Sequence, residues 1–187
     1  VADSLTSATM TIDVTAVNDL PTATDNTVTA TEDTAFVFAP VNFGFIDIDT
    51  ADVLQGITVT TLSSTGTLAL NGTAVTVDQS ISHDDIFEGA LTFTPLKDGN
   101  GIGYDSFQFT VNDGIADSLV PSTLTIDVAA VNDLPTATDN TVTATEDTAL
   151  VFVLADFGFT DVETDQLQSI TVTTLNATGT LLLDGSA

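Results

Sequence analysis

Apolar and polar residues alternate along most of the chain. In the stretch 105–111, Phe107, Phe109 and Val111 are separated by polar side chains. Alternation over about four to eight residues predicts a half-buried β-strand, because successive side chains of a strand point to opposite faces of its sheet. Similar segments, rich in Thr, Val, Ile and Phe and bounded by Gly, Asn or Asp, recur along the chain. They predict seven strands in one unit, at 24–31, 35–39, 56–62, 66–70, 90–94, 105–111 and 122–130.

The number and spacing of these strands predict the fold class. Seven short alternating strands in about 100 residues are typical of an all-β, immunoglobulin-like β-sandwich. A closed barrel is the alternative, but the long connections 40–55 and 71–89 favour Greek-key crossovers between two sheets. We expect the inward-facing side chains to form the core between the sheets: Leu91, Phe93, Phe107, Phe109, Ile126 and Val128.

One short helix is predicted among the strands, in the segment SHDDIFEG at 82–89. Ser82 can cap its first turn, and Asp84 and Asp85 are favourable there because the N-terminal end of a helix carries partial positive charge. Gly89 can end the helix. This helix would lie within the connection between the fourth and fifth predicted strands.

A long segment of the sequence occurs twice. The residues VNDLPTATDNTVTATEDTA stand at 17–35 and again at 131–149, an offset of 114 (131 − 17). A repeated unit of this length has the size of one domain. We therefore divide the chain into the C-terminal strand of a preceding repeat (1–17), one complete repeat (18–131) and the N-terminal half of the next (132–187). We expect a longer tandem array, in which neighbouring repeats or copies supply the strands that the partial repeats lack.

The charge of the chain is strongly one-sided. It has 27 acidic residues against one basic residue, Lys97, and a formal net charge of −26. A hydrophobic fraction of 43% and a mean hydropathy of +0.34 nevertheless indicate a folded core rather than disorder. Nucleic acid is excluded as a partner because almost nothing could neutralise phosphates. There is no cysteine for disulfides or thiolate sites, and no apolar run of the roughly 18 residues that membrane insertion requires.

The acidic residues gather in loops at the two ends of the predicted sandwich. Hard oxygen ligands in this number fit Ca²⁺, which takes about 6–8 of them. The D-x-D spacing of 47–49 and its counterpart 161–163 lets two carboxylates reach one ion. By residue type and position, the loops and the second linker offer these candidate ligands: Glu32, Asp33, Asp47, Asp49, Asp52, Asp98, Asp105, Asp113, Asn132, Asp133, Asp161, Glu163 and Asp165.

Several motifs together carry a family resemblance. The unit combines VNDLPTATDNTVTATEDTA, the D-x-D loop, LTFTP, GYDSFQFTVNDG and LTIDVAAVND. Over the whole chain it resembles the cadherin-like tandem repeats of large bacterial surface adhesins of the RTX type. The resemblance implies extracellular extender domains, rigidified by calcium at their junctions, that project a distal adhesive module from the bacterial cell surface. Its expected partners are adjacent repeats or neighbouring copies in a filament, with host or surface ligands bound through other domains.

The resemblance also implies which residues bind Ca²⁺. The expected ligands belong to the linkers, the TEDT turns and the D-x-D loops: Asn18, Asp19, Glu32, Asp47, Asp49, Asn132, Asp133, Glu146, Asp161 and Glu163. The partial repeat departs from the complete one, since Glu163 stands where the complete repeat has Asp49.

Other interpretations of these residues remain open. Asp and Asn favour turns for local hydrogen-bonding reasons, so any one of them can be a solvated turn residue. We expect no enzyme, because His83 is the chain's one histidine and lies beside the predicted helix cap. A calcium-dependent carbohydrate- or surface-binding β-sandwich is the alternative function. Such modules display exposed aromatic side chains, whereas the Phe residues here fall mostly at inward positions and Tyr104 is the one polar aromatic.

Overall fold

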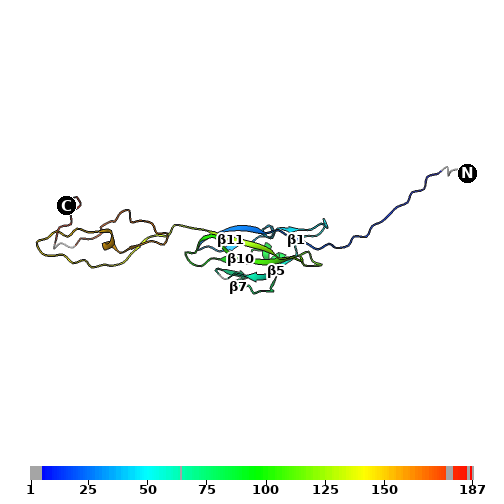
Figure 1. The fold of residues 1–187 in the computed structure, drawn as a ribbon, viewed down its shortest axis with the longest axis horizontal. Coiled ribbons are helices and arrows are strands. Elements are labelled where there is room, and N and C mark those ends of the chain that lie inside the picture. Colours follow the sequence, from blue (N-terminus) through cyan, green and yellow to red (C-terminus); the bar gives the residue numbers. More distant parts are fainter. Residues whose placement is uncertain (1–5, 64, 176–178, 185, 187) are drawn as a thin grey trace. The chain divides into compact units, whose positions relative to one another are not determined.

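The computed structural model describes residues 6–63, 65–175, 179–184 and 186 (Figure 1). The chain divides into two compact units, a first unit at Val1–Val131 and a second unit at Asn132–Ala187. In its described residues the first unit holds a five-stranded sheet, a four-stranded sheet and a short two-stranded one. The five-stranded sheet has the order β2 (Asn26–Thr31), β11 (Ser122–Ala129), β10 (Gly101–Asn112), β5 (Gly56–Leu62) and β8 (Ser80–Ser82). The four-stranded sheet has the order β3 (Phe36–Val37), β9 (Leu91–Thr94), β6 (Thr67–Leu70) and β7 (Thr73–Ala74).

The fold is an immunoglobulin-like β-sandwich, as the alternating pattern predicts. All seven predicted strands of the complete repeat are present, as β2, β3, β5, β6, β9, β10 and β11. A short pair, β1 (Thr22–Ala23) with β4 (Phe45–Ile46), adds to them and was not predicted. β2 pairs in parallel with β11, in register from Asn26↔Leu124 to Thr31↔Ala129, whereas the other pairs are antiparallel. The first and last long strands of the repeat therefore run side by side in the same direction.

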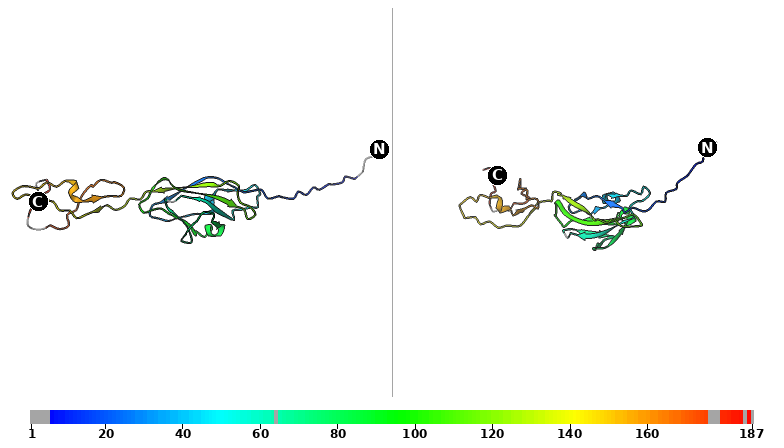
Figure 2. Two further views of the ribbon diagram at one scale, coloured as in Figure 1. Left: turned by 60° about the horizontal axis from the view of Figure 1, so that its bottom comes forward. Right: turned by 45° about the vertical axis from the view of Figure 1, so that its right-hand side comes forward.

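The predicted helix is confirmed as α1 (His83–Phe87), which directly follows the edge strand β8 (Figure 2). The Ser82 hydroxyl accepts a hydrogen bond from the Asp85 N–H at 3.1 Å, and Asp84 and Asp85 occupy the first turn. This cap satisfies one of the N–H groups that a helix start leaves without an intrahelical partner.

The core lies between the two sheets and contains every residue that the alternation predicts. Leu91, Phe93, Phe107, Phe109, Ile126 and Val128 are all at most 4% exposed. Phe43, fully buried, comes from the 3₁₀ helix η1 (Pro40–Phe43), which lies in the connection 40–55 and is not predicted by the alternating pattern. The Phe43 ring meets the Phe109 ring edge to face, with centroids 5.1 Å apart. Gly44 follows with a φ of 53°, a left-handed conformation that suits glycine.

The second unit contains counterparts of only a few N-terminal elements of the first. β12 (Thr136–Ala137) pairs with β13 (Phe159–Thr160), 114 residues after β1 and β4, and η2 (Leu154–Phe157) corresponds to η1. As the N-terminal half of a repeat, 132–187 was expected to form counterparts of the first four predicted strands, at 24–31, 35–39, 56–62 and 66–70. None of these counterparts is formed in its described residues. The physical reason is the lack of pairing partners: in the first unit β2 pairs with β11 and β5 with β10, and the described residues after 132 form no counterpart of β10 or β11.

The segment 6–17 likewise forms no strand, although 1–17 was predicted to be one; residues 1–5 lie outside the described part. Met10, Ile12 and Val14 are 79–88% exposed, whereas their counterparts in β11, each 114 residues later, are buried. The same side-chain pattern is thus a strand only where neighbouring strands pair with it. Within the described residues, no helix has the length and apolar character needed to cross a bilayer.

Candidate metal centre

Three segments of the first unit, all outside its strands, bring oxygen-bearing side chains close together. They are the linker at 18–19, the loop 47–52 between β4 and β5, and the turn that follows β10. We call the resulting group the linker cluster; it consists of Asn18, Asp19, Asp47, Asp49, Asp52 and Asp113. All of its ligand atoms are oxygens, which is the donor type that Ca²⁺ prefers.

The carboxylates of the loop are spaced for one ion. Asp47, Asp49 and Asp52 are half-buried, and each offers an oxygen that lies within 4.8 Å of the other two. Oxygens that bind Ca²⁺ at about 2.3–2.6 Å are at most about 5 Å apart, so the three can share one ion. The loop is held in this shape by the Asp49 N–H, which donates to Asp47 Oδ1 at 2.8 Å, and by the Asp52 N–H, which donates to the Asp49 carbonyl at 2.9 Å.

The linker is tied to both of the other segments. The Asn18 side-chain amide donates to Asp113 Oδ2 at 3.1 Å, and the Asp19 N–H donates to Asp49 Oδ2 at 2.8 Å. These contacts connect residues 95 and 30 positions apart. The chain segment that enters the sandwich is therefore fixed against two of its loops through the atoms of this cluster.

Two oxygens of the cluster are buried without a hydrogen-bond donor. They are Asn18 Oδ1 and Asp47 Oδ2. A buried acceptor left unsatisfied costs roughly 1–3 kcal/mol, more when it is charged. A cation placed among these oxygens would satisfy both, so the residues present fit a bound Ca²⁺.

The charges of the cluster also favour a cation. The N–H of Ala116 lowers the pKa of Asp113 below its ordinary value of 3.8, with the N–H of Ile115 and the Asn18 amide acting in the same direction. Burial raises the pKa of Asp52, and repulsion from Asp47, Asp49 and Asp113 adds to the increase. Asp113 is thus held in its charged form while Asp52 resists ionisation, which is the expected state of crowded carboxylates without a counter-ion.

A second group of predicted residues meets at the other end of β2. Glu32 accepts hydrogen bonds from the Val131 N–H and from the Asn100 side-chain amide, the latter at 2.8 Å. Asp33 Oδ1 accepts from the Asp98 N–H at 3.2 Å. The structure therefore brings Glu32 and Asp33 together with 98–100, as expected for the second end of the sandwich.

Asp105 is not part of that group. β10 begins at Gly101, four residues before the predicted start, so Asp105 belongs to the strand and not to the loop. It lies on the same inward face as Phe107 and Phe109 and is 6% exposed. The prediction that Asp105 is a loop residue of this ligand group was therefore wrong about its position.

The second unit repeats part of the linker cluster. The Asp133 N–H donates to Glu163 Oε2 at 3.1 Å, the counterpart of the contact between Asp19 and Asp49. The loop is one residue shorter here, and the Asp165 N–H donates to Asp161 Oδ1 at 3.0 Å. The longer side chain of Glu163 makes the same contact from the shortened loop.

The remaining predicted residues of this unit do not add to that contact. The Asn132 amide donates to the Asp133 carbonyl at 2.7 Å, as the Asn18 amide donates to the Asp19 carbonyl. Glu146 is exposed, and its backbone carbonyl accepts a hydrogen bond from the Thr148 hydroxyl at 3.4 Å. In the first unit, Asp52 completes the trio although the family resemblance pointed only to the D-x-D pair; its spacing in D-x-D-x-x-D was the available signal.

Comparison with known proteins identifies the domain. Residues 18–128 match the family described as Bacterial Ig domain. Integrin beta-like protein E of Dictyostelium discoideum is 34% identical over 110 residues, which are 59% of this chain and 6% of that protein. The chain thus spans only a small part of this relative's length, and no solved structure matches it. The family match covers the complete sandwich and more than half of the chain, which therefore belongs to the bacterial Ig domain family.

Proposed function

We propose that this chain is a structural segment of an extracellular bacterial surface protein, in which tandem Ig-like sandwiches form an extender rigidified by Ca²⁺. The observation that carries the proposal is the linker cluster. Three carboxylates share one ion-sized space, and the linker residues Asn18 and Asp19 are bonded to the same loops. An ion bound there would hold the entering chain against the sandwich.

The repeated sequence supports a role as extender. The linker and its first turn recur unchanged after 114 residues, so the same ligand types recur at the start of the next repeat. A rod made of such units keeps its length only if each linker is stiff. Calcium would supply this stiffness in a chain whose net charge of −26 otherwise makes its parts repel one another.

The surface setting is part of the same proposal. Membership of the bacterial Ig domain family supports an exposed, non-catalytic module. The Dictyostelium relative is described as integrin beta-like, which agrees with adhesion, although the likeness covers one domain of it. We assign this chain to the extender region of an adhesin of the RTX type or of a related filament.

A carbohydrate-binding role receives less support from the structure. Tyr104 is half-buried, and its hydroxyl accepts a hydrogen bond from the Leu96 N–H at 3.1 Å. Phe93, Phe107 and Phe109 are buried between the sheets, and Phe36 and Phe45 are partly buried against the core. Sugar rings would therefore find no aromatic platform among the described strands of the first unit.

Thermal unfolding with calcium and with a chelator tests the proposal. Calcium at a hundredfold excess over its dissociation constant stabilises the bound fold by about 2.7 kcal/mol, so the midpoint should rise with calcium concentration. Asp49→Asn should remove most of this rise because it neutralises a central ligand. Asp78→Asn is the matched control: Asp78 is exposed and has a φ of 64°, which Asn also tolerates. A melting curve that is the same in calcium and in chelator would refute the proposal.

The linker itself can be observed directly. The chain has no cysteine, so Ala16→Cys allows a single nitroxide label just before Asn18. Calcium should slow the motion of this label, seen as broadened lines in electron paramagnetic resonance. A label at Ala74→Cys, on the edge strand β7, should be unaffected. Calcium binding without any change at residue 16 would show that the ion does not stiffen the linker.

A further inference from the structure

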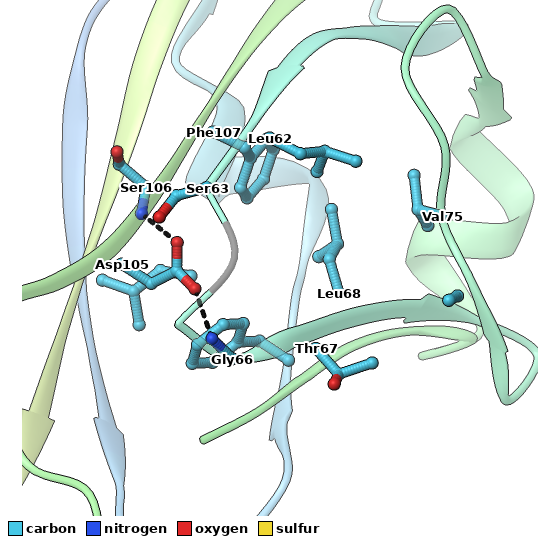
Figure 3. Close-up of a pocket in the computed structure, with 12 residues that line it drawn as sticks. Leu62, Ser63, Gly66, Thr67, Leu68, Val75, Asp105, Ser106 and Phe107 are labelled. Atoms are coloured by element: carbon cyan, nitrogen blue, oxygen red, sulfur yellow. Dashed lines mark hydrogen bonds between the residues drawn. The ribbon is translucent and has the colours of Figure 1, made fainter. Parts of the chain in front are cut away.

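A cavity of about 210 Å³ lies between the two sheets, beside the connection from β5 to β6 (Figure 3). Its walls are mainly core residues, and Ser63, Thr67 and Ala74, all exposed, form the rim. The aliphatic and aromatic walls include Leu62, Leu68, Val75, Phe93, Phe107 and Ile126. Compared with the roughly 30 Å³ that a water molecule occupies in the liquid, the cavity has room for about seven water-sized groups.

One carboxylate, that of Asp105, stands in this apolar wall. Its oxygens accept hydrogen bonds from the Gly66 N–H at 2.7 Å and from the Ser106 N–H at 2.6 Å (Figure 3). Neither of the two ion pairs in the described part of the chain involves Asp105; they join His83 to Asp84 and Lys97 to Asp98. Asp105 is therefore a buried acceptor group without a cation from the described residues.

The position of Asp105 depends on a close approach by Gly66. A Cβ atom on Gly66 would stand 2.3 Å from the Phe93 ring, so residue 66 has no room for a side chain. The glycine lets its N–H reach the carboxylate while its backbone passes close to the Phe93 ring. The carboxylate and the apolar wall are thus held together by the same contact.

We propose that this cavity binds a primary alkylammonium group, with the ammonium on Asp105 and the methylene chain against Leu68, Val75 and Phe107. The free acceptor capacity of a carboxylate favours an ammonium donor, and burial strengthens such a charge-assisted bond. The apolar wall selects an aliphatic chain over a hydrated metal ion, for which one carboxylate is too few ligands. The net charge of the chain concentrates cations around it.

Two sources present this group: a lysine side chain of a partner protein, and a free small amine. Both can place an aliphatic chain of four or five carbons next to an ammonium, which the cavity can hold. The experiment therefore uses n-pentylammonium as the free amine and Nα-acetyl-lysine methylamide as the lysine side chain. 1-Pentanol, which has the same chain and no charge, is the control for simple apolar binding.

Binding can be followed by NMR on the whole chain in saturating calcium at constant ionic strength. We expect n-pentylammonium to shift the Gly66 and Ser106 amide signals saturably, because both groups donate to Asp105. Asp105→Asn should weaken binding by about tenfold or more, as expected when a hydrogen bond to a charged group is lost. Asp127→Asn should leave binding unchanged; Asp127 lies on β11 and accepts from the Gly103 N–H.

Leu68→Phe provides a second variant should Asp105→Asn fail to fold, because the larger side chain fills the cavity and should block binding. If the lysine derivative also binds, the natural ligand is a lysine side chain of a partner protein. If only n-pentylammonium binds, the natural ligand is a free amine. The proposal is overturned if n-pentylammonium gives no saturable shift, if 1-pentanol binds equally well, or if the folded variants bind as the wild type does.

Discussion

Truncation of Phe109 to alanine tests the core of the sandwich and the register of β10 together. Phe109 is fully buried, and its ring contacts those of Phe43 and Phe107, with centroids 5.1 and 6.0 Å apart. A buried Phe→Ala change costs about 3–5 kcal/mol, and each favourable ring pair contributes about 0.5–1.5 kcal/mol beyond its buried area. With two such neighbours we expect a loss in the upper part of that range, about 4–5 kcal/mol. This is a large fraction of the roughly 5–15 kcal/mol that holds a typical domain folded.

Urea unfolding in saturating calcium is the appropriate assay. Urea is uncharged, so it does not screen the acidic clusters as guanidinium would. The chain has one Tyr and no Trp, and Tyr104 lies in β10, so its fluorescence reports on the first unit alone. The midpoint should fall while the slope stays the same, since the change affects stability and not the surface exposed on unfolding.

Phe87→Ala is the matched control for this prediction. Phe87 is 73% exposed, and its ring stacks on that of His83. Exposed substitutions usually change stability by at most about 0.5 kcal/mol. If Phe109→Ala lost no more stability than Phe87→Ala, β10 would be displaced by one residue and its inward and outward faces would be exchanged.

Two further substitutions test the loops. Asp52→Asn should act in opposite directions with and without calcium. Because the folded-state pKa of Asp52 is raised, its contribution to stability is present below its ordinary value of 3.8 and lost as the pH rises through the raised value. In chelator at pH 7 the neutral Asn should therefore raise the urea midpoint, whereas the rise that calcium produces should shrink; a lower midpoint in chelator would contradict this. Gly44→Ala should cost more than about 2 kcal/mol, because its φ is 53° and a Cβ would stand 2.9 Å from the Thr24 carbonyl oxygen. Gly72→Ala is the control, because Gly72 has a φ of 75° but no atom within 4 Å of the added Cβ. An equal loss of stability in both variants would show that the contact with Thr24 is unimportant.

Most of the sandwich could be predicted because the alternation of apolar and polar residues within each strand shows which of its side chains are buried. Alternation in 105–111 and 122–130 fixed which side chains face the core, and the structure buries Phe107, Phe109 and Ile126 as expected. Phe43 was missed because its neighbours show no period-2 pattern; it enters the core through the single turn η1, whose formation depends on tertiary contacts.

The linker cluster could be predicted in part for a different reason. Once the order of strands is known, the loop 47–52 and the turn after β10 lie at the end where the linker enters, whatever their detailed shape. Asp105 was misplaced because the boundary of a strand is set by its pairing: β10 extends to Gly101 opposite Val128 of β11. The strands expected in 132–187 depend on partners distant in sequence, which local alternation does not reveal.

The parallel pairing of β2 with β11 decides how the sandwich responds to force. The chain enters through β2 at one end of this pair and leaves through β11 at the other. Tension between the two ends of the repeat therefore slides the strands along each other, and the six paired positions from Asn26↔Leu124 to Thr31↔Ala129 bear the load together. Antiparallel terminal strands pulled from the same end would instead separate one pair at a time. A repeat held at its two ends would thus be loaded in shear along this strand pair, and its pairs would not open one after another.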